Sequence, residues 1–259
     1  MRQRPILILG TAVALIAALT ASVALAGAPV TGADGNSQSI DVKVGPKKLS
    51  KTQLSPATLE VTTKVTTSNP NGVPVPAVRV VVDFDKNAKL FTKGVPTCSA
   101  SQLQNNSTEV AIQNCKNAII GRGKAAAVLP VGEKVFPVAQ QVTAFNGVPQ
   151  GGKPVVLLHT YGTTPIQTAL VLTGVVSNYN KQGFGPRLDV DVPLIAGGAG
   201  ALLEFNVKID KKFTYKGKKR SFISAKCPNN KKLKSRGAFT FKDGETITAF
   251  SNQSCQQRG

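Results

Sequence analysis

Short segments of alternating apolar and polar residues follow one another from residue 39 almost to the end of the chain. In TLEVTTKVTT, residues 58–67, the apolar Leu59, Val61 and Val65 are separated by polar neighbours, many of them β-branched. A period of two residues places successive side chains on opposite faces of a β-strand, so that one face can be buried. VRVVVDF, residues 78–84, is more continuously apolar and predicts a central strand.

Gly, Pro, Asn or Asp residues bound these segments, and almost no stretch has helical periodicity. We therefore expect an all-β protein, an antiparallel β-sandwich of the jelly-roll or Ig-like kind with roughly 10–13 strands. The candidate strands are residues 39–44, 58–67, 78–84, 125–129, 140–145, 155–161, 168–176, 187–193, 202–209, 213–216, 220–226, 238–242 and 246–251. Asp243-Gly244 is a strong hairpin-turn signal and predicts that the last two of these segments pair.

One internal stretch departs from the β pattern. Between Cys98 and Cys115, either Asn106 or Ser107 can cap a short helix whose first turn contains Glu109. We expect a short helical insertion at this point.

The N-terminus has the features of an export signal. Arg2 and Arg4 precede an uncharged apolar run that extends over residues 6–26 and ends in Ala24-Leu25-Ala26. A basic start, an apolar centre and small residues at the cut predict a signal peptide over residues 1–26, cleaved after Ala26. The alternative is an uncleaved membrane anchor. We expect a flexible leader over residues 27–38 and a single β-sandwich body over residues 39–259.

The cysteine count agrees with export. The four cysteines are Cys98, Cys115, Cys227 and Cys255, and an even number in an oxidising compartment predicts two disulfides. Three pairings are possible, and the local one, Cys98 with Cys115 and Cys227 with Cys255, is the simplest. Zinc is the alternative, but no two cysteines stand two residues apart and the only histidine, His159, is remote from both pairs.

Basic residues dominate the charge of the chain. Lys and Arg number 32 against 13 Asp and Glu, and between Lys208 and Arg236 the only acid is Asp210. Two predicted turns hold the candidate anion-binding residues, which are Lys216, Lys218, Lys219, Arg220, Lys231, Lys232, Lys234 and Arg236. Adjacent turns of an antiparallel sheet can lie at opposite ends, so the two groups need not form one patch.

Such a charge attracts polyanions, and the expected partner is an anionic wall polymer or a membrane surface. Specific nucleic-acid binding is not expected, because no recognised motif is present and only Phe213, Tyr215 and Phe222 are near enough to stack on bases. The alternative is that the lysines keep a secreted β protein soluble and protect its sheet edges from pairing.

Residues that could carry catalysis are few. Asp83 with Asp85, and Asp189 with Asp191, stand two residues apart, so each pair projects from one face of its strand. Paired carboxylates can bind calcium or share the acid and base roles of glycoside hydrolysis, but a solvated strand face is the simpler interpretation. His159 has no nucleophile motif to serve and is interpreted as structural. We expect no catalytic residue, no metal site and no cofactor.

Several segments, most of them framed by cysteines, resemble a known protein family. They are VDFDKN (residues 82–87), GVPTCSASQL (94–103), NCKNAIIGRGKAA (114–126) and AKCP…FTFKDG…C (225–255). They look like a family of secreted, β-rich, disulfide-containing proteins of high-GC Gram-positive soil bacteria that has no established activity. The resemblance implies secretion, paired cysteines and a β-rich fold, and it carries no catalytic residue.

The function expected from the sequence is therefore that of a secreted, non-enzymatic, strongly basic protein of the cell envelope or the extracellular space. The first alternative is a polymer-acting hydrolase that uses the paired Asp residues. The second is a structural extracellular β-sandwich with no specific ligand.

Overall fold

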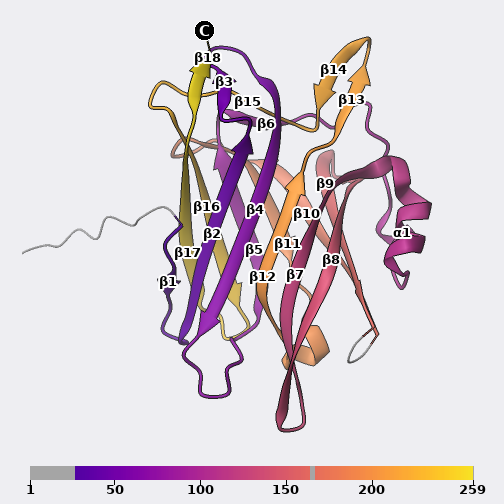
Figure 1. Ribbon diagram of the computed structural model, residues 1–259, viewed down its shortest axis with the longest axis vertical. Coiled ribbons are helices and arrows are strands. Elements are labelled where there is room, and N and C mark those ends of the chain that lie inside the picture. The colour runs from indigo at the N-terminus through magenta and orange to yellow at the C-terminus, as the bar shows by residue number, and fades with distance from the viewer. Residues whose placement is uncertain (1–26, 164–166, 259) are drawn as a thin grey trace, which may run out of the picture.

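One large antiparallel sheet curls until its first and last strands lie side by side (Figure 1). The computed structural model describes residues 27–163 and 167–258, so the predicted signal peptide lies outside the described residues. The strands follow one another around the sheet in the order β1 (Val30–Thr31), β2 (Asn36–Gly45), β4 (Ser55–Thr67), β12 (Ala201–Ile209), β7 (Ile119–Val131), β8 (Lys134–Gln150), β9 (Lys153–Gly162), β10 (Thr168–Asn178), β11 (Phe184–Asp191), β5 (Ala77–Asp85), β16 (Lys232–Phe241) and β17 (Thr246–Ser254).

Side chains rather than a backbone ladder join the two ends of this sheet. The Ser251 hydroxyl accepts a hydrogen bond from the Val42 amide at 2.9 Å. The Gln253 amide group accepts from the Val44 amide and donates to the Val44 carbonyl. The molecule is thus a nearly closed barrel. The predicted antiparallel β fold is confirmed, whereas the division into two facing sheets is not, because every long strand belongs to the same sheet.

The segment expected to be a flexible leader is part of the barrel instead. Its residues 27–38 include β1 and the first residues of β2, and the Gly27 amide donates to the Phe250 carbonyl at 2.8 Å. Asn36 is fully buried and exchanges two hydrogen bonds with the backbone of Val75. Polar side chains of this segment join it to the rest of the barrel, since the partner of Asn36 lies 39 residues away in the sequence.

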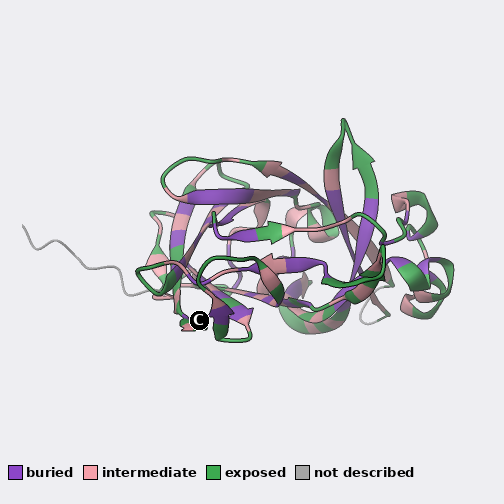
Figure 2. Cartoon of the chain, turned by 90° about the horizontal axis from the view of Figure 1, so that it is seen from above, coloured by how far each residue is buried: buried purple, intermediate pink, exposed green. Residues whose placement is uncertain are grey.

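The inward faces of the strands form the main apolar core. Ile40 and Val42 of β2, Val82 and Phe84 of β5, and Phe239 of β16 are among its buried members. Figure 2 looks along the barrel and shows buried positions alternating with more exposed ones along the strands. This is the two-residue period that the sequence predicted.

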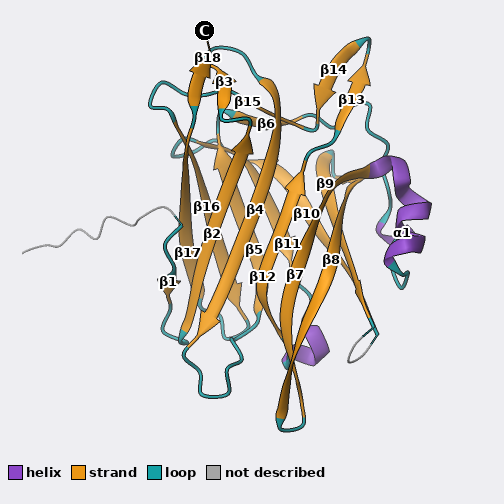
Figure 3. Cartoon of the chain, viewed as in Figure 1, coloured by secondary structure: helices purple, strands orange, loops and turns teal. Residues whose placement is uncertain are grey.

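The predicted helical insertion is confirmed and packs outside the barrel. Helix α1 (Thr108–Cys115) begins after Ser107, whose hydroxyl accepts from the Val110 amide, and it lies beside β8 and β9 (Figure 3). The Cys98–Cys115 disulfide ties the insertion together, and a second small core forms between it and the outer face of the sheet. Short 3₁₀ turns occupy Ala100–Gln102, Lys116–Ala118 and Ile195–Gly198.

Short strands gather at one end of the barrel. They are β3 (Lys48–Ser50), β6 (Ala88–Leu90), β13 (Lys212–Tyr215), β14 (Lys218–Ser221), β15 (Ile223–Ala225) and β18 (Gln256–Arg258). Strand β15 pairs with both β4 and β6, and its neighbour Phe222 is buried in the core, so this end of the interior is covered. Within the described residues, no helix combines the length and the apolar character that a membrane crossing needs.

Candidate anion-binding site

Both basic turns of the sequence lie at the end of the barrel that carries the short strands (Figure 1). The sequence predicted one strand over residues 220–226, which would separate the two turns by the length of that strand. The structure has a break there, because β14 ends at Ser221 and β15 starts at Ile223 in a different pairing. Between them Phe222 is 1% exposed, and its amide donates to the Lys211 carbonyl at 2.9 Å. This bend brings the second turn back to the same end.

The second turn belongs to a group of exposed cations that we call the basic cap. The Cys227–Cys255 disulfide holds it together, and the parallel pair β3–β18 adds a third chain segment. Backbone hydrogen bonds of 2.8–2.9 Å link the Cys255 amide to the Lys231 carbonyl and the Gln256 amide to the Lys47 carbonyl. The members of the basic cap are Lys47, Lys48, Lys51, Lys231, Lys232 and Arg258.

The first turn forms a second exposed group, the basic hairpin, made by β13 and β14. Its members are Lys212, Lys216, Lys218, Lys219 and Arg220. Aromatic contacts anchor the hairpin to the barrel, since the Phe91 ring stacks on Phe213 at 6.0 Å and meets the edge of Tyr215 at 5.6 Å. The Arg220 guanidinium lies 5.2 Å from the centre of the Phe91 ring. The hairpin is therefore a positioned element with its charges directed to solvent.

No carboxylate of the described residues forms an ion pair with a member of these two groups. In the described part of the chain, the ion pairs are Lys43–Asp41, Lys64–Glu204, Arg79–Asp189, Arg187–Asp83 and Arg236–Asp83, and none includes a member of the basic cap or the basic hairpin. Like charges gathered without counter-charges repel one another and attract anions from solution. This end is consequently a surface that attracts anions.

Two of the predicted anion-binding residues have other partners. The Lys234 ammonium donates to the Gln182 carbonyl at 2.5 Å and lies 4.8 Å from the centre of the Phe184 ring. Arg236 donates to the Asp83 carboxylate through Nε at 3.0 Å and Nη2 at 2.5 Å. Both side chains lie on the outer wall of the barrel. The Arg236 guanidinium forms an ion pair with Asp83 and is therefore not free to bind an external anion.

Asp83 is the centre of that network. Its side chain is 2% exposed and also accepts from Arg187 at 2.6 and 3.1 Å. Burial alone would raise the pKa of the Asp83 carboxyl, but the hydrogen bonds and charges of Arg187 and Arg236 outweigh burial and hold the pKa below its ordinary value. Asp85 accepts from the amide and side chain of Asn87 and from the Lys234 amide, which makes it a turn-forming residue.

The second carboxylate pair lies beside the first, because β11 pairs with β5. Asp189 and Asp191 line an open depression of about 490 Å³ together with Arg79. Arg79 donates to both oxygens of Asp189, and the hydrogen bond is the main cause that lowers the pKa of the Asp189 carboxyl. In the described structure Asp85 accepts hydrogen bonds only from Asn87 and the Lys234 amide, and the charge of Asp191 contributes to the raised pKa of Arg79. No pair of unpartnered carboxylates among these four acids therefore flanks a common cleft.

His159 joins the helical insertion to the barrel. It is fully buried on β9, and its Nε2 lies 3.0 Å from the carbonyl oxygen of Asn106, just before α1. Burial lowers the pKa of the His159 imidazole, so the neutral form is favoured. This geometry supports a structural role.

An acidic group at the opposite end of the barrel was not predicted. Oxygens of Asp34, Asp243 and Glu245 all lie within 4.8 Å of one another, an arrangement in which carboxylates can hold a cation. Glu245 accepts from the amides of Ala33 and Asp34 at 2.6 and 2.8 Å, so it already bridges the two turns. Burial, together with Glu245, raises the pKa of the Asp34 carboxyl. The only sequence signal was an Asp-Gly dipeptide in each turn.

Comparison with protein-family models, with curated proteins and with solved structures finds no match to this chain. The case for an anion-binding site therefore rests on the arrangement of the basic residues alone.

Proposed function

We propose that this protein is secreted and, without catalysing a reaction, associates with anionic polymers of the cell envelope through the basic end of the barrel. The two disulfides suit an oxidising, extracellular compartment. The polymer class that fits best is a flexible chain of phosphates, because several separated ammonium groups can each meet one phosphate along it.

The observation that carries the proposal is that the basic cap and the basic hairpin lie at the same end of the barrel and form no ion pair with a carboxylate of the described residues. The fold gathers them by the bend at Phe222, by the Cys227–Cys255 disulfide and by the aromatic contacts of Phe91. Lysines that serve only solubility would be expected on all faces, with acids interspersed. Here both basic groups lie at one end, while the acidic group Asp34, Asp243 and Glu245 lies at the other end.

The hydrolase alternative gains no support from the site, since Asp83 and Asp189 are neutralised by arginines and Asp85 holds a turn.

The test is the salt dependence of binding to fluorescently labelled linear polyphosphate, measured by anisotropy. If binding releases counter-ions from the polyanion, the logarithm of the association constant falls linearly with the logarithm of the salt concentration. The magnitude of this slope is about 0.7 for each phosphate contacted on a single-stranded polyanion. Lys218→Glu with Lys219→Glu removes two contacts and should lower the slope by about 1.4.

The matched control is Lys134→Glu with Lys242→Glu, which changes the net charge by the same amount at the far end. Exposed charges are screened beyond about 8 Å at 0.15 M salt, so the control should bind almost as the unmodified protein does. Binding that is indifferent to salt, or that the control weakens as strongly as the hairpin variant, would contradict the proposal. A parallel titration with anionic vesicles tells whether membrane surfaces also bind.

A further inference from the structure

The interior of the barrel is incompletely filled. Three voids of about 130, 80 and 30 Å³ lie among the inward side chains. Val192 and Leu202 line all three, so the voids adjoin one another. Natural cores contain few voids larger than a water molecule, so a set of this size along one barrel is unusual and offers room for a small ligand.

The chemistry of the largest void excludes polar ligands. Thr63 is the only polar side chain among the described residues that line it, and the others are aliphatic or Phe. Apolar cavities of about 150 Å³ stay dry and accept small nonpolar molecules. The void of about 130 Å³ falls in this range.

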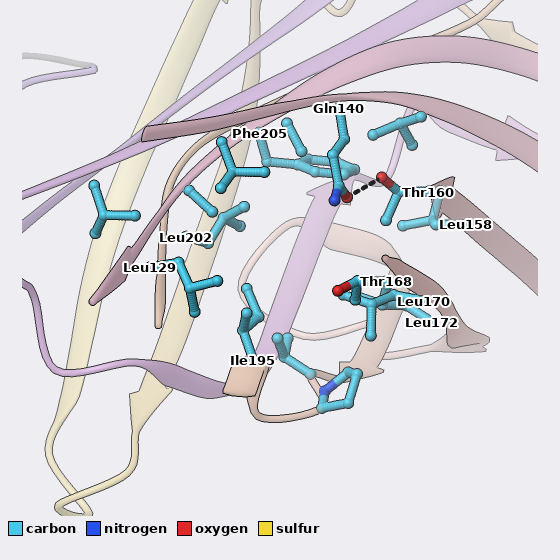
Figure 4. A pocket seen from close by; sticks show the side chains of 17 residues that line it. Leu129, Gln140, Leu158, Thr160, Thr168, Leu170, Leu172, Ile195, Leu202 and Phe205 are labelled. Carbon is cyan, nitrogen blue, oxygen red and sulfur yellow. Dashed lines mark hydrogen bonds between the residues drawn. The ribbon is translucent and has the colours of Figure 1, made fainter. Parts of the chain in front are cut away.

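Polar groups collect in the neighbouring void of about 80 Å³, which Figure 4 shows. Gln140, Thr160 and Thr168 line it, and the Thr160 hydroxyl donates to the Gln140 side-chain oxygen at 2.5 Å. The exposed Pro193 and the half-buried Val138 also belong to its wall, so this void lies near the surface. No charged side chain of the described residues lines any of the three voids.

The two ends of the interior differ in access. Phe222 and Ile223 cover the interior at the basic end and line the large void from there. At the opposite end the β7–β8 hairpin extends beyond the other strands (Figure 1). Its tip exposes Val131 and Phe136 on the face of Leu129, which lines the outer void, and Phe136 pairs with Leu129. An apolar surface thus leads from the hairpin tip to the voids.

We propose that the barrel binds a neutral single-chain amphiphile, with its alkyl tail in the large void and its head group at Gln140 and Thr160. We infer an apolar tail because the residues that line the large void are apolar. We infer a single tail because a void of about 130 Å³ has no room for a second alkyl chain. The head group is uncharged because no ionised side chain faces it, and hydrogen-bonding because Gln140 and Thr160 are the polar groups that it meets. A medium-chain alcohol such as 1-octanol has this chemistry, and its size suits the adjoining voids of about 130 and 80 Å³ together. This site is separate from the basic end, so either proposal can fail alone.

The experiment is calorimetric titration of the full mature chain with 1-octanol, n-octane and octanoate. We expect saturable binding of 1-octanol with one molecule per chain, weaker binding of octane, and binding of octanoate at least tenfold weaker than that of 1-octanol. Gln140→Leu removes the head-group partner at nearly constant size. The substitution should weaken the binding of 1-octanol about fivefold, as the loss of one hydrogen bond does, and should leave the binding of octane unchanged.

Occupancy of the voids is tested by Val192→Phe, which places a ring where all three meet. Val192→Phe should weaken the binding of 1-octanol at least tenfold. The matched control is Val148→Phe, at a half-exposed position on the outside of the barrel, and it should not change the binding of 1-octanol. Ala127→Leu narrows the outer void and replaces Val192→Phe as the test if that variant does not fold. Failure of the unmodified protein to bind either neutral probe, or equal weakening by Val192→Phe and Val148→Phe, would overturn the proposal.

Discussion

Replacing Asp83 with Asn should destabilise the fold more than any other exchange of one polar side chain for a similar one. The Asp83 carboxylate is 2% exposed and accepts four hydrogen bonds, two from Arg187 and two from Arg236. An amide presents its own N–H donors to the two guanidinium groups and leaves their charges without a partner. Removing one member of a buried ion pair costs about 3–5 kcal/mol.

The lower end of that range applies, because the Arg187 and Arg236 side chains keep 29% and 20% exposure and water can still reach them. We expect a loss of about 3 kcal/mol in the free energy of unfolding at pH 7, and a fall in Tm of roughly 6–12 °C for a chain of this size. Urea titration followed by circular dichroism measures the first, and calorimetry the second.

The pH dependence separates the ion pair from mere packing. The pKa of Asp83 is lower in the folded than in the unfolded chain, so its stabilisation is complete above about pH 3.8 and is lost as the pH falls through the folded value. The difference between the unmodified protein and Asp83→Asn should therefore shrink towards pH 2. A cost below about 1 kcal/mol, which is typical of exposed pairs, or a cost that does not change with pH, would refute this reasoning.

Three further predictions concern stability at other sites and are measured by urea titration. Because burial lowers the pKa of His159, the free energy of unfolding should fall as the pH drops below 6.5, and His159→Gln should remove that part of the fall; an unchanged pH profile would contradict it. Replacing Cys227 and Cys255 together by Ala opens a loop of 28 residues and should lower the free energy of unfolding by about 3.5 kcal/mol. An unchanged free energy of unfolding would contradict this expectation. The raised pKa of Asp34 means that its ionised form opposes folding at pH 7, so Asp34→Asn should stabilise the protein at pH 7 but not at pH 3.

Local features of the fold were predictable because local chemistry determines them. Asp243-Gly244 specified the last hairpin, and Thr240 indeed pairs with Thr246 across it. Of the three possible cysteine pairings the simplest, local one is confirmed, and of the two candidate caps, Asn106 and Ser107, the structure has Ser107. In each case the signal lies within a few residues of the structure that it specifies.

The order of strands was not predictable in the same way. Alternation shows which side chains face the interior but not which strand lies beside which, and pairs such as β4–β12 and β5–β16 join residues more than a hundred positions apart. Closure of the sheet through Ser251 and Gln253 depends on two polar side chains that carry no distinctive pattern. The interior voids were missed for a related reason, since a pattern that points residues inward does not say whether they fill the space.

The basic end shows how one local feature can change a functional prediction. The sequence predicted a single strand over residues 220–226, and with such a strand the two basic turns can lie at opposite ends of the sheet. The buried Phe222 breaks that strand, because its ring enters the core while its amide bonds to Lys211. Phe222 and Ile223 are consecutive apolar residues, so the alternation slips by one position at the bend, and the interpretation of residues 220–226 as one strand passed over this signal.

The central claim is that the basic end is where polyanions bind, and lysine footprinting tests it most directly. The folded protein is acetylated briefly with and without linear polyphosphate, and the modification of each lysine is measured by mass spectrometry. We predict protection of Lys47, Lys48, Lys218, Lys219, Lys231 and Lys232, with Lys134 and Lys242 at the far end modified equally in both samples. Uniform protection of all exposed lysines, or protection confined to the far end, would contradict the account.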